Sequence, residues 1–160
     1  MLTVTVIAVG KIKEKYFTDA IGEYSKRLGR YCKLNIVELK DEATPDNPSD
    51  KERDAVLKKE GERIAEKIPK GAYVVALCIE GKMKNSVEFS KLLEQTAASG
   101  CSEIVFVIGG SFGIYDDIKR RADFKLSFSE MTFPHQLMRV ILLEQLYRAF
   151  NISGGGKYHK

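Results

Sequence analysis

In the segment "EIVFVIGGSFG", Glu103–Gly113, an apolar, β-branched run leads directly into glycines. A short continuous apolar run of this kind is typical of a strand that is buried on both faces. The glycines that follow can adopt positive φ or let a ligand approach the main chain closely. The motif matches neither GxGxxG nor GxxxxGK[ST], so a plain tight turn is as good an interpretation as a nucleotide site.

On both sides of this segment, strand-like and helix-like segments alternate along the whole chain. Near-continuous apolar strands separated by helices indicate an α/β fold, with a parallel sheet covered by helices on both faces. No repeat, low-complexity tract or linker interrupts this order, which predicts one domain over residues 1–160. The expected strands are residues 2–9, 34–39, 72–81, 103–108 and 124–129. The expected helices include residues 49–67, one that begins after Asn85, a short one that ends near Ala122, and residues 136–150.

Composition narrows the class of protein. The chain has 160 residues, 44% of them hydrophobic and 30% charged, which is ordinary for a globular protein. A net charge of +4 permits a nucleic-acid partner without requiring one. Three cysteines without metal-ligand spacing, and no signal or membrane-spanning segment, predict a reduced protein in the cytoplasm with no membrane association. These cysteines are Cys32, Cys78 and Cys101.

The charge run "DKERDAVLKKEGERIAEK" looks like an interaction site, but it also fits one face of a helix. Apolar residues recur along it at helical spacing and define one buried stripe. We therefore expect its charged side chains to be solvated. The residues of the stripe are Val56, Leu57, Ile64 and Ile68.

Three turns should lie close together at one edge of the sheet. They are "LCIEGK" (Leu77–Lys82), "IGGSFG" (Ile108–Gly113) and "SFSEMTFPH" (Ser127–His135), and each follows an expected strand. Ligands of open parallel sheets bind outside the carboxyl ends of the strands, so these turns predict a common pocket. Spacing alone does not identify its ligand.

The segment "MTFPHQLMRVILLEQLYRAF", Met131–Phe150, predicts a helix that is apolar nearly all round. Such a helix must be buried nearly all round, which predicts a homodimer that packs through it. Its two arginines, Arg139 and Arg148, either pair with acids or reach an anionic ligand, and the sequence favours neither. The glycines after Ser153 predict that residues 153–160 form a flexible tail.

Four segments carry a resemblance to a known family: "VIAVGK", "FVIGGSFG", "LSFSEMTFPHQLMRVILLEQLYRAF" and the terminal "YHK". Over its whole length the chain resembles the ribosomal RNA large subunit methyltransferase H family, of the SPOUT class. The resemblance implies an S-adenosylmethionine-dependent enzyme that methylates N3 of a pseudouridine in 23S rRNA on the assembled ribosome. It also implies a homodimer, and a SPOUT-type α/β knot in which the C-terminal part threads through a loop as a trefoil.

The resemblance assigns the cofactor to the three turns. Leu77 should contact its methionine or adenosine part, and Gly109 should lie against it. Six residues should surround the adenine with main-chain groups; they are Phe128, Ser129, Glu130, Met131, Thr132 and Phe133. An apolar slot with exposed main-chain donors and acceptors suits adenine.

Methyl transfer to an imide nitrogen requires close placement and removal of a proton. His135 or His159 could accept that proton, while Arg139 and Arg148 could stabilise the developing charge or grip phosphates. Tyr158, in the tail, could stack on a flipped base. Two histidines without an acid or cysteine cluster argue against zinc, and we expect no metal.

RNA contacts would fall on basic residues of the N-terminal third, although each taken singly is better explained as a solvated residue. They are Lys11, Lys13, Lys15, Lys26, Arg27 and Arg30. Two other classes remain open. A non-catalytic RNA-binding module would keep the basic surface without a cofactor, and a phosphoryl transferase would need a lysine and carboxylates that the glycine turn lacks.

Overall fold

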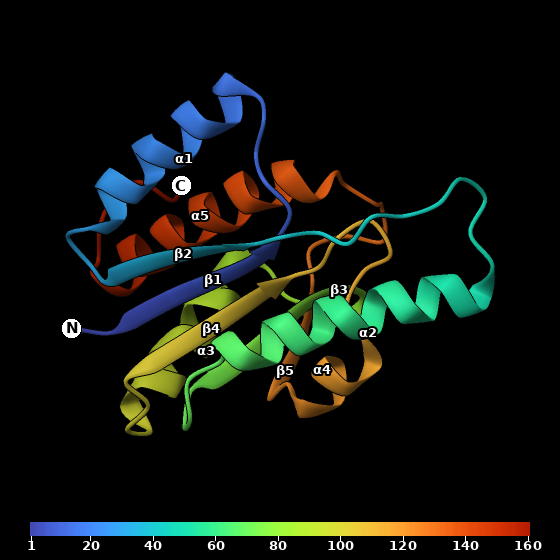
Figure 1. The fold of residues 1–160 in the computed structure, drawn as a ribbon. Helices are drawn as coiled ribbons and strands as arrows, with labels where there is room; N and C mark the ends of the chain where they lie inside the picture. Colours follow the sequence, from blue (N-terminus) through green and yellow to red (C-terminus); the bar gives the residue numbers. More distant parts are fainter.

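Five strands and five helices alternate along the chain in the computed structural model, which describes residues 1–160 (Figure 1). The alternation agrees with the one that the apolar runs predict. The strands are β1 (Thr3–Val9), β2 (Lys33–Leu39), β3 (Tyr73–Met83), β4 (Glu103–Ile108) and β5 (Phe124–Ser127). The helices are α1 (Lys15–Leu28), α2 (Asp50–Lys67), α3 (Ser86–Ala98), α4 (Asp116–Arg121) and α5 (His135–Ser153).

All five strands are parallel, in the order β2-β1-β4-β3-β5. The apolar run Glu103–Ile108 forms β4 at the centre of the sheet, where its residues from Ile104 to Ile108 are all buried. Strand β1 pairs with β2 on one side and with β4 on the other, so Thr3 lies opposite both Lys33 and Glu103. The predicted parallel sheet is confirmed, although β5 ends at Ser127, two residues earlier than expected.

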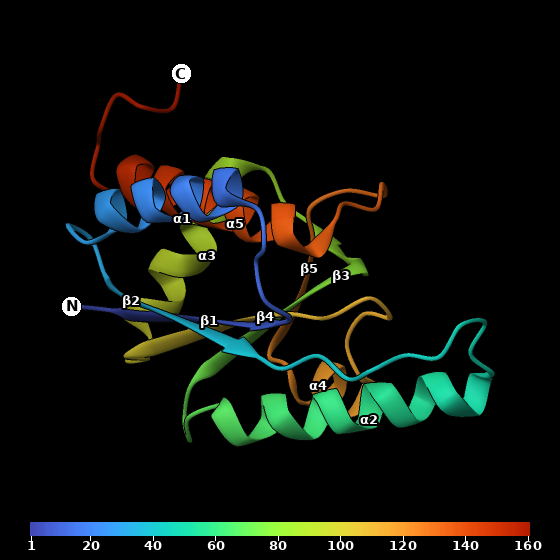
Figure 2. The same ribbon diagram turned by 45° about the horizontal axis from the view of Figure 1, so that its top comes forward.

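Helices cover both faces of the sheet, as Figure 2 shows most clearly. Helices α1, α3 and α5 pack on one face, where residues such as Leu28, Leu93 and Leu142 join the inward side chains of the strands. Helices α2 and α4 pack on the other face, with Ile64 and Ile118 in the second core. Because β1 and β4 are buried between two apolar layers, each has a nearly continuous apolar sequence, whereas the edge strand β2 is partly exposed and carries polar residues.

Helix α2 is the charged segment of the sequence. A capping box starts it: Ser49 Oγ accepts from the Glu52 N–H, and the Glu52 carboxylate accepts from the Ser49 N–H. Val56, Ile64 and Ile68 are buried, as predicted, and most of the charged residues face solvent. Glu60 is the exception, since only 5% of it is exposed.

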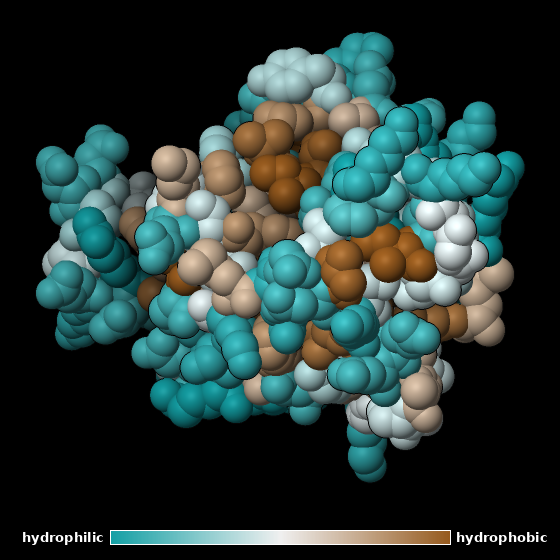
Figure 3. Space-filling view, turned by 180° about the vertical axis from the view of Figure 1, so that it is seen from behind, coloured by the Kyte–Doolittle hydropathy of each residue, from teal (hydrophilic) through white to brown (hydrophobic).

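Helix α5 begins one residue earlier and ends three residues later than the sequence predicts. It lies between α1 and α3 on the sheet, so neighbouring helices cover much of the surface for which we expected a second subunit. Its outward residues Leu137, Val140 and Ile141 remain partly exposed. Figure 3 views this face of the molecule and shows patches of hydrophobic side chains on it.

Two further expectations concern the chain as a whole. None of the helices combines the length and the hydrophobicity that crossing a membrane requires. Threading of the C-terminal part as a trefoil knot stays a prediction from the resemblance.

Candidate functional site

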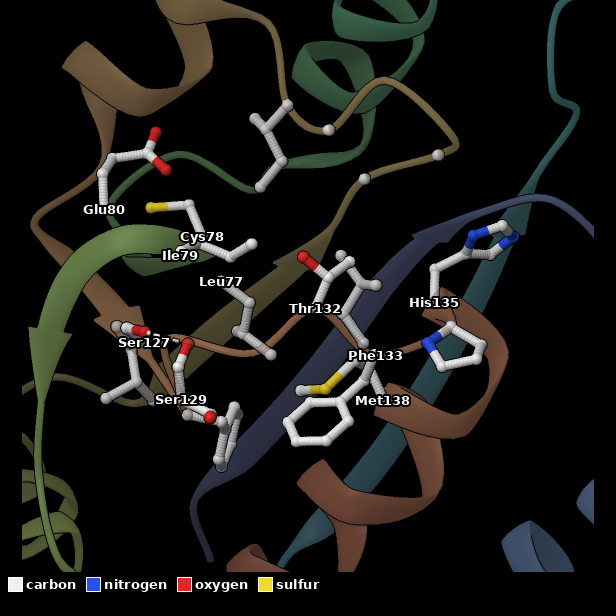
Figure 4. A pocket seen from close by; sticks show the side chains of 18 of the residues that line it. Leu77, Cys78, Ile79, Glu80, Ser127, Ser129, Thr132, Phe133, His135 and Met138 are labelled. Carbon is white, nitrogen blue, oxygen red and sulfur yellow. Dashed lines mark hydrogen bonds between the residues drawn. The ribbon is translucent and has the colours of Figure 1, made fainter.

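The three turns that the sequence singled out meet in one cleft of about 780 Å³. It lies at the carboxyl ends of β3, β4 and β5, and half of the residues that line it are hydrophobic. Leu77 from β3 faces Phe133 and Met138 across the cleft (Figure 4). The size and lining are those of a site for a drug-sized ligand or cofactor.

A break in the register of β3 shapes one wall. Leu77 and Lys82 both pair with Leu126 of β5, so the residues between them bulge out of the ladder. Gly81 allows this bulge to lie close against β5, because a Cβ there would stand 2.7 Å from the Lys125 main chain. At the rim, Glu80 of the bulge forms an ion pair with Lys119 of α4.

The glycine turn after β4 forms a second wall. The Gly113 N–H donates to the Gly110 carbonyl over 3.0 Å, and Gly113 has a φ of +89°. A Cβ on Gly109 would stand only 2.2 Å from the Gly113 oxygen. The turn therefore requires glycine at position 109 to fold back on itself beside the cleft.

The segment after β5 forms the third wall and presents its main chain. Ser127 Oγ donates to the Ser129 carbonyl over 3.0 Å, and the Met131 N–H donates to Ser129 Oγ over 3.0 Å. The other main-chain groups of residues 128–133 make no hydrogen bonds within the protein and remain available to a ligand. Five of the six residues assigned to adenine line the cleft, whereas Glu130 lies outside its lining.

His135 stands where the cleft meets a second, smaller cavity (Figure 4). Burial lowers the pKa of its imidazole below the ordinary value of 6.5, and the Arg139 charge lowers it further, whereas Asp41 acts in the opposite direction. At neutral pH the ring is therefore uncharged and able to accept a proton.

Arg139 is the largest fully buried side chain, with 2% exposure. Its guanidinium donates to Glu38 Oε2 and to the Gly10 carbonyl, each over 2.6 Å. The sequence left open whether Arg139 pairs with an acid or reaches an anionic ligand. In the structure it pairs with an acid, Glu38. These contacts hold the start of α5 against the ends of β1 and β2. Arg139 therefore stabilises the structure beside the cleft but does not line it.

Arg148 belongs to a separate cluster with the tail. Its guanidinium donates to Glu144 Oε1 over 2.6 Å, lies 3.1 Å from His159 Nδ1 and stacks 4.6 Å from the centre of the Tyr158 ring. The Tyr158 hydroxyl donates to the same Glu144 oxygen over 3.0 Å. The tail thus folds back on α5 and holds an aromatic ring, a guanidinium and an imidazole together at the surface.

The structure does not bring this cluster to the cleft of the same chain. Arg148 follows His135 by thirteen residues along α5, which corresponds to about 20 Å of helix. The C-terminus lies toward the end of α5 that is opposite to the turns that form the cleft (Figures 1 and 2). The five residues predicted to act in catalysis therefore fall into two groups, with His135 and Arg139 in one and the tail cluster in the other.

Sequence reasoning missed several residues of this region. Met138 lines the cleft because it lies one turn after Pro134, and Lys119 reaches the rim from α4. Glu60 lines the smaller cavity, and its position midway between Val56 and Ile64 in the apolar stripe signalled its burial. The structure holds no group of three or more His, Cys, Asp or Glu side chains placed to bind a metal ion.

Comparison with known proteins identifies the class of protein to which this chain belongs. The model of the family described as predicted SPOUT methyltransferase matches residues 2–159. A solved structure of a probable methylase family protein from Haemophilus influenzae Rd KW20 shares the fold, with a TM-score of 0.53 and 11% identity over 99% of this chain and 70% of that one. The fold is that of a SPOUT methyltransferase.

Closer relatives define the family within that class. The ribosomal RNA large subunit methyltransferase H of Clostridium kluyveri is 57% identical over 159 residues, which are 99% of this chain and 100% of that protein. The protein of the same name from Clostridium novyi is 55% identical over the same shares of both chains. The chain belongs to the ribosomal RNA large subunit methyltransferase H family.

Proposed function

We propose that this enzyme transfers a methyl group from S-adenosylmethionine to N3 of a pseudouridine in 23S rRNA, on the assembled ribosome in the cytoplasm. The observation that carries the proposal is the cleft, in which a glycine turn and a segment of free main-chain groups face each other across apolar walls. The family supports the choice of substrate, because its members are named as methyltransferases of large-subunit ribosomal RNA.

The residues of the cleft fit S-adenosylmethionine. Leu77, Phe133 and Met138 provide apolar surface for the adenosyl group, and the free main-chain groups of residues 128–133 provide donors and acceptors for the adenine edge. Gly109 and Gly110 let the main chain approach it without side chains in between. When bound, the cofactor supplies an electrophilic methyl group on a sulfonium.

His135 is the residue best placed to accept the proton of the imide. It borders the cleft, and its imidazole is uncharged at neutral pH. Loss of the imide proton places negative charge on the base carbonyls, and a cation close to them would stabilise that charge. Arg139 is already engaged with Glu38, so this cation comes from elsewhere.

The proton acceptor makes the pH dependence testable. The methylation rate should be constant around neutral pH and fall only in an acid limb whose midpoint lies below 6.5, because protonated His135 cannot accept a proton. Single-turnover rates measured from pH 5 to 8 give this profile. The groups that surround the imidazole are Arg139 on α5, Asp41 and Glu42 after β2, and Glu60 on α2.

The control for this measurement is His135→Gln, which cannot titrate. It should be slower than the unaltered enzyme at neutral pH and should lack the acid limb. An acid limb that persists unchanged in this variant would assign the titration to another group and contradict the role of His135.

The cation and the aromatic ring come, in this proposal, from a second copy of the chain. The tail cluster lies about 20 Å along α5 from the cleft of its own chain, too far to touch a base bound there. A homodimer that packs through the partly exposed apolar face of α5 would bring the partner's tail to the cleft. Tyr158 would then stack on the base, and Arg148 or His159 would face its carbonyls.

Two measurements test this proposal, one for the methylation and one for the homodimer. Purified ribosomes incubated with the enzyme and labelled cofactor should gain one methyl group per 23S rRNA, located by mass spectrometry of rRNA fragments. Light scattering should give about 36 kDa, twice the chain mass of 18.0 kDa. A protein that binds ribosomes but neither binds the cofactor nor methylates them would be the non-catalytic RNA-binding module.

A further inference from the structure

Glu60 is a buried acid that the mechanism above does not use. It lies on α2, on the opposite side of the sheet from α5, and only 5% of it is exposed. Its Oε2 accepts from the Glu42 N–H over 3.0 Å, whereas its buried Oε1 has no partner. A buried acceptor without a partner is costly, and such groups in native proteins call for an explanation.

The free oxygen lies beside the glycine turn that follows β4. A Cβ built on Gly110 would stand 3.1 Å from Glu60 Oε1, so glycine at this position keeps a side chain from packing against this buried oxygen. Glu60 also lines a cavity of about 50 Å³ that shares Gly110, Ser111, Phe112 and His135 with the large cleft. Glu60 therefore borders a small space that adjoins both the proposed cofactor site and the proposed proton acceptor.

The cavity has room for a water molecule or for one edge of a planar ring, but not for a whole base. Three carboxylates border it, those of Asp41, Glu42 and Glu60, together with the hydroxyls of Thr44 and Ser111, which can donate or accept. Because a carboxylate only accepts, a ligand edge that meets these acids is best matched by an N–H donor. A pseudouridine whose N3 faces the cofactor has one other ring donor, N1–H, whereas uridine has a C–H at the equivalent edge.

We propose that Glu60 is a specificity-determining residue whose free oxygen accepts a hydrogen bond from N1–H of the target pseudouridine. This inference rests on the proposed function, because it needs a base bound between the cleft and the small cavity. A site built to bond a donor discriminates strongly against an analogue that lacks the donor, since its buried acceptor is then left unpaired. Glu60 would thus favour pseudouridine over uridine at the same position.

Glu60→Gln tests the assignment because it replaces one hydrogen-bond acceptor by a donor. The glutamine oxygen must continue to accept from the Glu42 N–H, which turns the amide NH₂ toward the cavity, where it meets the N1–H donor. On ribosomes that carry pseudouridine, we expect kcat/KM to fall about 10- to 100-fold. On ribosomes that carry uridine at that position, the already low rate should change much less, so the ratio between the two substrates narrows.

Glu62→Gln is the matched control, since Glu62 is exposed on the same helix and carries the same change. It should leave both rates and their ratio unaltered. Calorimetric titration with S-adenosylmethionine should give the same affinity for the Glu60 variant as for the unaltered enzyme, which shows that the cleft is intact. If Glu60→Gln does not fold, Gly110→Ala covers the free oxygen while Glu60 stays, and should narrow the same ratio at saturating cofactor.

Three results would overturn the proposal. Equal losses on both kinds of ribosome would show that Glu60 only supports the fold, and an unchanged rate on pseudouridine would show that nothing binds its free oxygen. Failure of the unaltered enzyme to methylate either ribosome would overturn the proposed function, and this inference with it.

Discussion

Replacing Gly109 by alanine should weaken the binding of S-adenosylmethionine at least about 100-fold, which is a loss of about 3 kcal/mol. The added Cβ would stand 2.2 Å from the Gly113 oxygen and 2.4 Å from its carbonyl carbon. Both atoms belong to the main chain, so no side chain can rotate away and the whole turn must move. Because this turn forms one wall of the cleft, its displacement changes the shape that the cofactor must fit. Isothermal titration calorimetry measures the affinity directly.

The same substitution at Gly22 is the control. Gly22 is exposed on α1, and a Cβ there would have no neighbour within 4 Å. Gly22→Ala should leave the affinity unchanged and increase the stability of the helix by up to about 1 kcal/mol. If Gly109→Ala bound the cofactor normally while its melting temperature matched that of the unaltered protein, the cleft would not be the cofactor site.

Deletion of residues 157–160 should reduce the methylation rate on ribosomes about 100- to 1000-fold at saturating cofactor. It removes the Tyr158 ring and the His159 imidazole, and leaves Arg148 paired with Glu144 alone. The fold should survive, because these residues lie on the outside of α5 and outside both cores. Single-turnover kinetics with and without the deletion give the effect, and a rate that stays the same would remove the tail from the mechanism.

A mixing experiment then decides which chain the tail serves. One chain carries Gly109→Ala and an intact tail, and the other has a normal cleft and lacks residues 157–160. If the tail acts on the partner's cleft, the mixed dimer contains one complete site and regains part of the activity. If the tail acts on its own cleft, no combination is complete and the mixture stays inactive. The separation of about 20 Å along α5 leads us to expect recovery.

Apolar runs in the sequence predict the strands of the sheet, but they do not predict where the pairing between strands is irregular. Residues 103–108 read as a buried strand because helices cover both faces of the sheet, and the structure places them at its centre. No local pattern indicates that β3 continues past Gly81 to Met83, because the bulge between Leu77 and Lys82 depends on pairing with β5. Local pattern reports burial, but it does not report which strand lies alongside.

In the candidate site, too, local sequence predicts some features, and others depend on contacts between distant residues. Its three turns were predictable because each one follows an apolar strand. The pairing of Arg139 with Glu38 joins residues 101 positions apart, which no local pattern contains. The separation of His135 from Arg148 within one chain is predictable, because thirteen residues of helix span about 20 Å. The burial of Glu60 was also readable, because it occupies the same helical row as Val56 and Ile64.

The order of the strands has a consequence for synthesis on the ribosome. The first strand made, β1, lies between β2 and β4, and one of the two cores combines β1 with the final helix. Contacts such as Thr5 Oγ1 to Glu103 Oε2 and Arg139 to Glu38 join halves of the chain that emerge far apart in time. A nascent chain that ends before α5 leaves the α1 face of its sheet open and cannot complete its core. Folding must therefore wait until nearly the whole chain has left the exit tunnel, and release of the polypeptide becomes the step that makes the enzyme competent.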